Sequence, residues 1–319
     1  MPVHAISADL LSQSLSGEKS GLHESLHESR LREWCSLLES GAILYFPQTP
    51  VPIPAEDLAV LLRQKQTGSG QHKNIAYKPA RDLLTGIDES ASSASERAQM
   101  HQIMRRYSSS VAEFLSTFLA PYARRWQLDY ASYRPFEEQN RDLSTRHRND
   151  LLHTDAFPTR PTRGARILRF FHNIHPDPAR TRDWMVTQPF AQWLDRFSPG
   201  QIPLPTPDNA LRRTGRQLAK ATGIASLLPG LKRTPYDDFM MRLHNAMKED
   251  AGFQQTCPKE HVNFPPGSSW MVYTETVPHA VLAGQFALEQ TFLVDPRANV
   301  TPESAPLMIL EKLAGAPLA

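Results

Sequence analysis

The sequence predicts an α+β protein, because segments with helical periodicity come first and segments typical of strands come later. One helix is predicted from residue 28 onward, where apolar residues share one face: Leu31, Trp34, Cys35 and Leu38. Gly41 can end that helix. A longer helical region is predicted over 95–122, with an apolar face of its own: Met100, Ile103, Met104, Tyr107 and Val111.

The predicted strands are short apolar runs bounded by proline, glycine or aspartate. They cover residues 42–46, 166–174, 268–275, 280–282 and 286–294. Residues 64–95 are polar and rich in serine, glycine and lysine, and they predict a loop region. A long insertion over about 177–262 separates the second strand from the third, and it contains a predicted helix near 237–250.

Length and composition are those of a globular protein, with 319 residues of which 40% are hydrophobic and 21% charged. We predict a single domain over 1–319, with mainly helical support from 1–130 and a β-rich core from 131–300. The net charge of +2 gives no electrostatic argument for binding nucleic acid. Cys35 and Cys257 are too few for a disulfide framework.

The sequence favours a cytoplasmic protein. Residues 1–30 lack the basic start and the apolar core of about 7–15 residues that mark a signal peptide. No stretch approaches the run of about 18 apolar residues that a membrane span needs. The segment 211–233 is basic and has an apolar patch at 224–228, so it fits either contact with an anionic membrane surface or an insertion packed on the domain.

The triplet His153-Thr154-Asp155 is the main candidate for chemistry. In an extended backbone, residues two apart point to the same side, so this histidine and aspartate can reach one metal ion. A second histidine from elsewhere would complete a face of two histidines and one carboxylate, which leaves positions open for an oxoacid and dioxygen on iron. The triplet alone is a weak signal, because a solvated histidine and aspartate in a loop would look the same.

His279 is the candidate for the second histidine. It follows a Pro-Gly turn at 265–267, an apolar strand and the sequence Pro-His-Ala-Val, which is how a double-stranded β-helix commonly delivers its distal metal ligand. His244 is expected to pack in the core instead, because it shares a helix face with three apolar residues: Met240, Leu243 and Met247.

Two runs around these ligands resemble the Kdo hydroxylase family: LLHTDAFPTRPTRGARILRFFHNIHP (151–176) and FPPGSSWMVYTETVPHAVLAGQFALEQTFLV (264–294). The shorter runs AILYFP (42–47) and SYRPFEEQN (132–140) are similar to it as well. The resemblance implies a jelly-roll-like, cupin-like double-stranded β-helix with flanking N-terminal helices, and a metal centre of His153, Asp155 and His279 that binds Fe(II).

The resemblance also implies the reaction. An enzyme of this family would use 2-oxoglutarate and O2 to hydroxylate C3 of 3-deoxy-D-manno-oct-2-ulosonic acid (Kdo), with release of succinate and CO2. Its partner would be the glycolipid Kdo-lipid A of the lipopolysaccharide inner core, reached at the cytoplasmic face of the inner membrane by peripheral contact. Ascorbate is expected to help the reaction in vitro.

Arginines are the candidates for binding the anionic reactants, since a guanidinium suits carboxylates and phosphates. Many oxygenases of this class hold the distal carboxylate of 2-oxoglutarate with an arginine or lysine about ten residues beyond the distal histidine, but here that region reads Ala-Leu-Glu-Gln-Thr (287–291). Arg169, inside an apolar strand, is therefore the first candidate and Arg134 the second. Arg182 and Trp184 are candidates for contact with the sugar, although Trp184 suits a core position equally well.

Two other functions stay open at this point. The same oxygenase chemistry could act on another substrate, such as a protein side chain in the manner of JmjC-like hydroxylases. Alternatively, the triad could hold zinc, or the scaffold could be a binding module without catalysis, because a fold does not fix a function.

Overall fold

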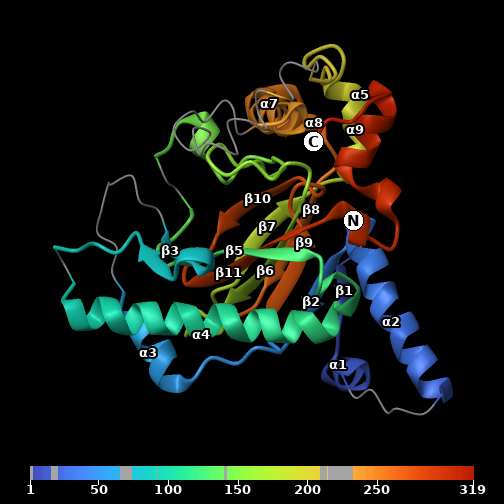
Figure 1. Ribbon diagram of the computed structural model, residues 1–319. Coiled ribbons are helices and arrows are strands. Elements are labelled where there is room, and N and C mark those ends of the chain that lie inside the picture. The colour runs from blue at the N-terminus through green and yellow to red at the C-terminus, as the bar shows by residue number, and fades with distance from the viewer. Residues whose placement is uncertain are drawn as a thin grey trace.

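The computed structural model describes residues 3–15, 21–64, 74–90, 92–139, 142–208, 214 and 233–319. Within them a large sheet and a small sheet face each other, and helices cover the outer side of the large sheet and one end of the small sheet (Figure 1). The predicted mixture of helices and strands is confirmed. The basic segment 211–233 lies outside the described residues, apart from Thr214 and Arg233.

The large sheet has eight strands in the order β1-β2-β9-β6-β11-β5-β3-β4. Its pairs are antiparallel, except that β1 runs parallel to β2. The strands are β1 (Val3–Ala5), β2 (Ile43–Phe46), β3 (Ile75–Lys78), β4 (Leu83–Thr85), β5 (Trp126–Arg134), β6 (Arg166–Asn173), β9 (Ser269–Tyr273) and β11 (Ala287–Val294).

The small sheet has three antiparallel strands in the order β10-β7-β8, namely β7 (Arg182–Val186), β8 (Glu260–Phe264) and β10 (His279–Ala283). Aromatic side chains fill the space between the two sheets. Trp270 on β9 stacks on Phe264 with ring centroids 3.9 Å apart, and Trp184 meets Trp270 edge-on at 5.6 Å. These contacts fix the distance between the sheets and therefore the position of β10, which begins with His279.

The helices form two groups. α1 (Ala8–Leu15), α2 (Gly21–Glu39), α3 (Ala55–Arg63) and α4 (Ala94–Phe118) pack on the outer face of the large sheet, and α5 (Leu194–Phe197), α7 (Pro235–Glu249), α8 (Ala251–Thr256) and α9 (Pro306–Ala314) gather near β10 (Figure 1). Short 3-10 turns lie at Pro79–Arg81, Ala120–Tyr122, Thr145–His147, Phe190–Gln192, Pro296–Ala298 and Pro302–Ser304. Among the described residues, no helix combines the length and apolar character needed to cross a membrane.

Local sequence explains where the two helices that matter most begin. Ser93 caps α4, since its hydroxyl accepts from the Glu96 amide while the Glu96 carboxylate accepts from the Ser93 amide. α7 begins in the same way with Thr234 and Asp237, and Pro235 occupies its first turn. Asp237 also accepts from the amide of Arg163, which ties α7 to the segment that leads into β6.

The predicted strands are confirmed as β2, β6, β9, β10 and β11, and the predicted helices as α2, α4 and α7. The prediction of a loop over 64–95 is wrong for β3 and β4, which form one edge of the large sheet. Both strands are short and lie in polar sequence, so they carry little periodicity. The long insertion begins and ends with β7 and β8, which the sequence did not reveal because β8 is an exposed, polar edge strand.

The buried His172 on β6 makes the stability of the fold depend on pH. Burial lowers the pKa of His172 to about 4, and no described residue gives its Nδ1 a hydrogen bond. Below the ordinary histidine pKa, the unfolded chain binds a proton at this residue before the folded chain does, so the native state loses stability as pH falls from about 6.5 to about 4.

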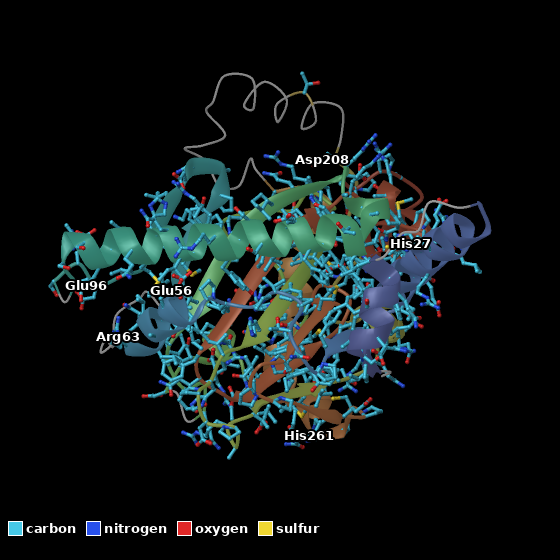
Figure 2. All side chains as sticks on the ribbon, turned by 90° about the horizontal axis from the view of Figure 1, so that it is seen from below. His27, Glu56, Arg63, Glu96, Asp208 and His261 are labelled. Carbon is cyan, nitrogen blue, oxygen red and sulfur yellow. The ribbon has the colours of Figure 1, made fainter. Side chains whose placement is uncertain are left out.

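We therefore expect His172→Phe to remove up to about 3 kcal/mol of this acid destabilisation in the metal-free protein. Urea unfolding at a series of pH values measures it, as the difference in unfolding free energy between the variant and the wild type. The matched control is His261→Phe on the outer strand β8, where the side chain is exposed (Figure 2). A His172→Phe protein with the wild-type pH dependence would contradict the prediction.

Candidate metal centre

Main-chain pairing brings the two predicted histidines together. The amide of His153 donates to the carbonyl of His279 at 3.1 Å, and the amide of His279 donates to the carbonyl of His153 at 3.0 Å. Two residues further on, the amide of Asp155 donates to the carbonyl of Thr274 at 2.9 Å. The segment 153–155 is thus held in extended form between β10 and the end of β9, so that His153 and Asp155 point to one side.

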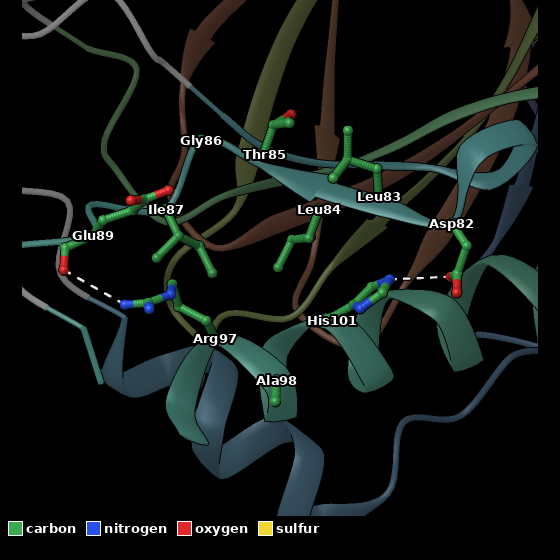
Figure 3. Close-up of a pocket in the computed structure, with 10 residues that line it drawn as sticks. All are labelled: Asp82, Leu83, Leu84, Thr85, Gly86, Ile87, Glu89, Arg97, Ala98 and His101. Carbon is green, nitrogen blue, oxygen red and sulfur yellow. Dashed lines mark hydrogen bonds and ion pairs between the residues drawn. The ribbon is translucent and has the colours of Figure 1, made fainter. Parts of the chain in front are cut away.

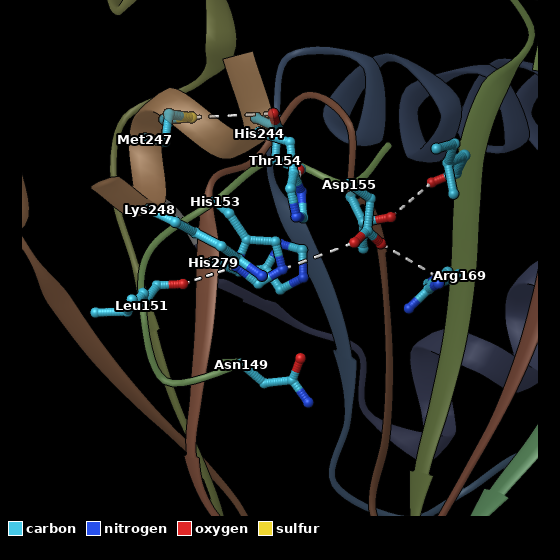
Figure 4. A network of polar contacts seen from close by, with 12 residues as sticks. Asn149, Leu151, His153, Thr154, Asp155, Arg169, His244, Met247, Lys248 and His279 are labelled. Atoms are coloured by element: carbon cyan, nitrogen blue, oxygen red, sulfur yellow. Dashed lines mark hydrogen bonds and ion pairs between the residues drawn. The ribbon is translucent and has the colours of Figure 1, made fainter. Parts of the chain in front are cut away.

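The side chains of His153, Asp155 and His279 converge (Figure 4). Their nearest ligand atoms lie within 4.8 Å of one another. Nδ1 of His153 donates to the carbonyl of Leu151 at 2.7 Å, and Nδ1 of His279 donates to the carbonyl of Val277 at 2.9 Å. A carbonyl can only accept, so each Nδ1 carries the proton and each Nε2 keeps its lone pair for a metal.

Electrostatics also prepare the three groups as ligands. Burial lowers the pKa of both histidines, so they stay neutral and able to donate electron pairs. Burial alone would raise the pKa of Asp155, but the positive charge of the Arg169 guanidinium holds it well below its usual range. Asp155 is therefore ionised, as a ligand must be.

The donor set fits a divalent metal ion that prefers mixed nitrogen and oxygen ligands. Oδ2 of Asp155 is buried and has no hydrogen-bond partner among the described residues, although Nε of Arg169 lies 3.3 Å from it. Arg169 supplies a nearby charge but no hydrogen bond, so this buried oxygen keeps its lone pairs for a metal ion. Two histidines and one carboxylate are the donor set of non-haem iron sites that take an oxoacid and dioxygen at their remaining positions.

A chain of alternating buried charges runs from the triad into the large sheet. Arg169 on β6 lies 3.3 Å from Asp155 and 3.6 Å from Glu289 on β11, and Arg134 on β5 lies 3.2 Å from the same Glu289. Arg134 also donates to Glu138 at 2.9 Å. Each buried cation thus has an anion beside it, which offsets the cost of burying the charges.

Arg182 and Trp184, which were predicted to contact the sugar, are buried on β7 near the triad. Arg182 is 2% exposed and pairs with Glu138, and burial lowers its pKa to about 10. It also packs on Gly284, where a Cβ atom would come within 2.9 Å of the arginine side chain. Trp184 is 1% exposed and stacks on the ring of His279, with centroids 5.1 Å apart. In this position Arg182 supports Glu138, and Trp184 supports the ring of His279.

The sequence did not identify two polar residues of α7 as neighbours of the triad. The ring of His244 meets that of His153 edge-on at 4.8 Å, and its Nδ1 donates to the carbonyl of Thr154 at 2.7 Å. This contact agrees with the expectation that His244 packs and does not bind the metal. Lys248, one helical turn later, extends toward the two histidines of the triad (Figure 4). Only the spacing of four residues on a helix could have suggested that they share a face.

A separate hollow of about 730 Å³ lies between β4 and the first half of α4 (Figure 3). His101 contacts Asp82 there at 3.0 Å, and Arg97 donates to the carbonyl of Glu89. None of the residues that line this hollow belongs to the triad or to the chain of buried charges. It therefore is not part of the candidate metal centre.

A metal centre of two histidines and one carboxylate between two facing sheets defines a class, the non-haem iron oxygenases. The chain matches the model of the 3-deoxy-D-manno-oct-2-ulosonic acid (Kdo) hydroxylases over residues 22–317. The chain belongs to this family. No curated protein sequence matches it.

Solved structures of the Kdo hydroxylase KdoO, a non-haem Fe(II) alphaketoglutarate dependent dioxygenase, are similar to the chain. The complex with alphaketoglutarate and Fe(III) is 31% identical with a TM-score of 0.79, and the match covers 100% of this chain and 98% of that chain. The complex with cobalt(II) is 31% identical with a TM-score of 0.80, and the match covers 100% and 97%. The apo structure is 32% identical, with a TM-score of 0.79 and the same coverages of 100% and 97%.

We expect His153→Ala to weaken metal binding by at least about 10-fold, because one of three ligands is lost. Titration of the metal-free protein with Co(II), followed by calorimetry, measures this. The control is His244→Asn, which removes the neighbouring ring yet can still donate to the Thr154 carbonyl. Wild-type affinity in His153→Ala, or an equal loss in His244→Asn, would contradict the assignment of the ligands.

Proposed function

We propose that the chain hydroxylates C3 of Kdo in Kdo-lipid A, consuming 2-oxoglutarate and O2 and releasing succinate and CO2. The observation that carries the proposal is the convergence of His153, Asp155 and His279 in a chain of the Kdo hydroxylase family. In this proposal the three residues hold Fe(II), and the iron when bound supplies the activation of dioxygen together with 2-oxoglutarate.

The protein's own part in the reaction is to place charges and exclude water. The Leu151 and Val277 carbonyls orient the two histidine rings, and Arg169 keeps Asp155 ionised. Each of the three ligand residues is at most 9% exposed, so the reacting groups would meet away from bulk water.

Arg169 is the first candidate and Arg134 the second for binding the distal carboxylate of 2-oxoglutarate. Both guanidinium groups lie beside the Glu289 carboxylate, and Arg169 also lies 3.3 Å from the ligand Asp155. A guanidinium fixed by a carboxylate is a preorganised site for a further carboxylate. Arg182 and Trp184 were first considered for the sugar. In this proposal Arg182 would hold Glu138 in place, and Trp184 would hold the ring of His279.

We also propose that the two facing sheets form a double-stranded β-helix of the jelly-roll type, within a single domain. The alternation of β6 supports this, since Phe171 faces the small sheet while Leu168 and Phe170 face the helices. The glycolipid would be reached by peripheral contact at the cytoplasmic face of the inner membrane.

The proposal predicts a gain of one oxygen on the Kdo of Kdo-lipid A. The test is mass spectrometry after incubation of the purified protein with Fe(II), ascorbate, O2 and 2-oxoglutarate. The gain should depend on 2-oxoglutarate and vanish in Asp155→Ala. Succinate without a modified sugar would overturn the substrate and favour another acceptor, such as a protein side chain. The absence of both succinate and modified sugar would overturn the oxygenase chemistry altogether.

Arg169→Gln should raise the KM for 2-oxoglutarate by about 10- to 100-fold, since a charge-assisted hydrogen bond to a carboxylate is lost. Initial rates of succinate release measure it. Because Arg169 also contacts Asp155, Co(II) affinity is measured in parallel to separate loss of the cosubstrate site from loss of metal. A matched arginine, Arg196→Gln on α5, should change neither quantity. An unchanged KM in Arg169→Gln would remove that residue from the cosubstrate site.

A further inference from the structure

The extended segment 152–154, which contains the ligand His153, is paired differently along its two edges. One edge pairs with β10, where His153 and His279 exchange two main-chain hydrogen bonds. Successive residues of an extended segment point their main-chain groups to opposite sides, so those of Leu152 and Thr154 face the other edge. In the part of the chain that the structure describes, side chains of α7 and α8 bond to that edge and no strand pairs with it. These side chains take the place of a strand.

Gln254 on α8 supplies the substitute at Leu152. Oε1 of Gln254 accepts from the Leu152 amide at 3.0 Å, and Nε2 of Gln254 donates to the Leu152 carbonyl at 2.8 Å. A carboxamide carries the same donor and acceptor as a peptide group, so the two bonds repeat the pattern between paired residues of an antiparallel sheet. Nε2 also donates to the carbonyl of Met247 on α7 at 2.7 Å. Both hydrogens of the Gln254 amide are thus used, which fixes its orientation.

The short helix α8 is itself held in place by a cap and by the core. Asp250 caps it, because its carboxylate accepts from the Phe253 amide at 2.8 Å. The Phe253 side chain is fully buried and meets the rings of Trp193 and Phe197 edge-on, with centroids 4.9 and 5.3 Å away. Since Gln254 follows Phe253 directly, this packing also fixes where the Gln254 side chain begins.

The planarity of the peptide bond links Gln254 to the ligand His153. The Leu152 amide and the Leu151 carbonyl belong to one rigid peptide plane, so the bond from Leu152 to Gln254 fixes the direction of that carbonyl. The Leu151 carbonyl accepts from Nδ1 of His153 at 2.7 Å, and this bond orients the ring and leaves Nε2 for a metal (Figure 4). A peptide group that donates a hydrogen bond also becomes a stronger acceptor.

We infer that Gln254 is a positioning residue for the metal ligand His153 and acts through the peptide between Leu151 and Leu152. This inference rests on the metal centre of the proposed function and deepens it. Without the Gln254 amide, the main-chain groups of Leu152 lose their partner beside a fully buried side chain, and the Leu151 carbonyl can turn away from His153. Residues that orient a metal-bound histidine typically contribute about 10- to 100-fold to metal affinity.

The test is a double-mutant cycle on metal affinity, measured by calorimetric titration of the metal-free protein with Co(II). Gln254→Met keeps the length of the side chain and removes its three hydrogen bonds. Co(II) affinity should fall about 10-fold when His153 is present. It should hardly change in the His153→Ala background, because the ligand through which Gln254 acts is then missing. The matched control is Gln255→Met, at the next and exposed position of α8, which should have no effect in either background.

An unchanged Co(II) affinity in Gln254→Met would overturn the inference. An equal loss in both backgrounds would overturn it as well and leave Gln254 as a support of the fold. If Gln254→Met does not fold, hydrogen exchange of the metal-free wild type decides: the Leu152 amide should exchange as slowly as the His153 amide, which β10 protects, and faster exchange would refute the inference. A wild-type protein that binds no Co(II) would overturn the proposed function instead, so the two failures are distinguishable.

Discussion

The reciprocal pair of main-chain hydrogen bonds between His153 and His279, at 3.1 and 3.0 Å, is the contact on which the candidate site depends. It joins residues that are far apart in sequence and makes their side chains neighbours without any help from the side chains themselves. The Asp155 amide, bonded to Thr274, fixes the third ligand relative to the first two. The geometry of the metal centre is therefore a property of the sheets, and a ligand can be replaced without losing the pairing that holds the fold.

The large sheet also pairs the buried charges that lie beside the candidate metal centre. Arg169, Glu289 and Arg134 come from three adjacent strands, β6, β11 and β5, and their charges alternate in sign across the sheet. Glu289 lies ten residues beyond His279, where many oxygenases of this class carry the basic residue that binds 2-oxoglutarate. The polarity is reversed here, so the carboxylate holds two arginines from the neighbouring strands on either side. Arg169 thus places a cation near the candidate metal centre, although β11, the strand that usually supplies the cation, carries the anion Glu289.

Much of the fold and the triad could be predicted from sequence, and the reasons for the gaps are physical. The strand that became β6 and the Pro-Gly turn before β9 are local signals, and the ligands lie directly beside them. Short, polar edge strands such as β4 and β8 are defined by their partners and not by their own periodicity, so their sequences look like loops. For a similar reason, the sequence could not show which way the Arg169 side chain faces. It depends on register, and only the pairing of β6 with β9 and β11 turns this residue toward Asp155.

His244 and Arg169 contact the segment 153–155 from different parts of the chain. Arg169 lies on the central β6, whose residues face two packed layers, so a change there disturbs the cores as well as the metal centre. His244 lies on α7, which the insertion between β7 and β8 supplies, and it contacts His153 and the carbonyl of Thr154. The proposed binding of the oxoacid thus depends on the large sheet, whereas the segment that carries two of the ligands is also held by an added helix.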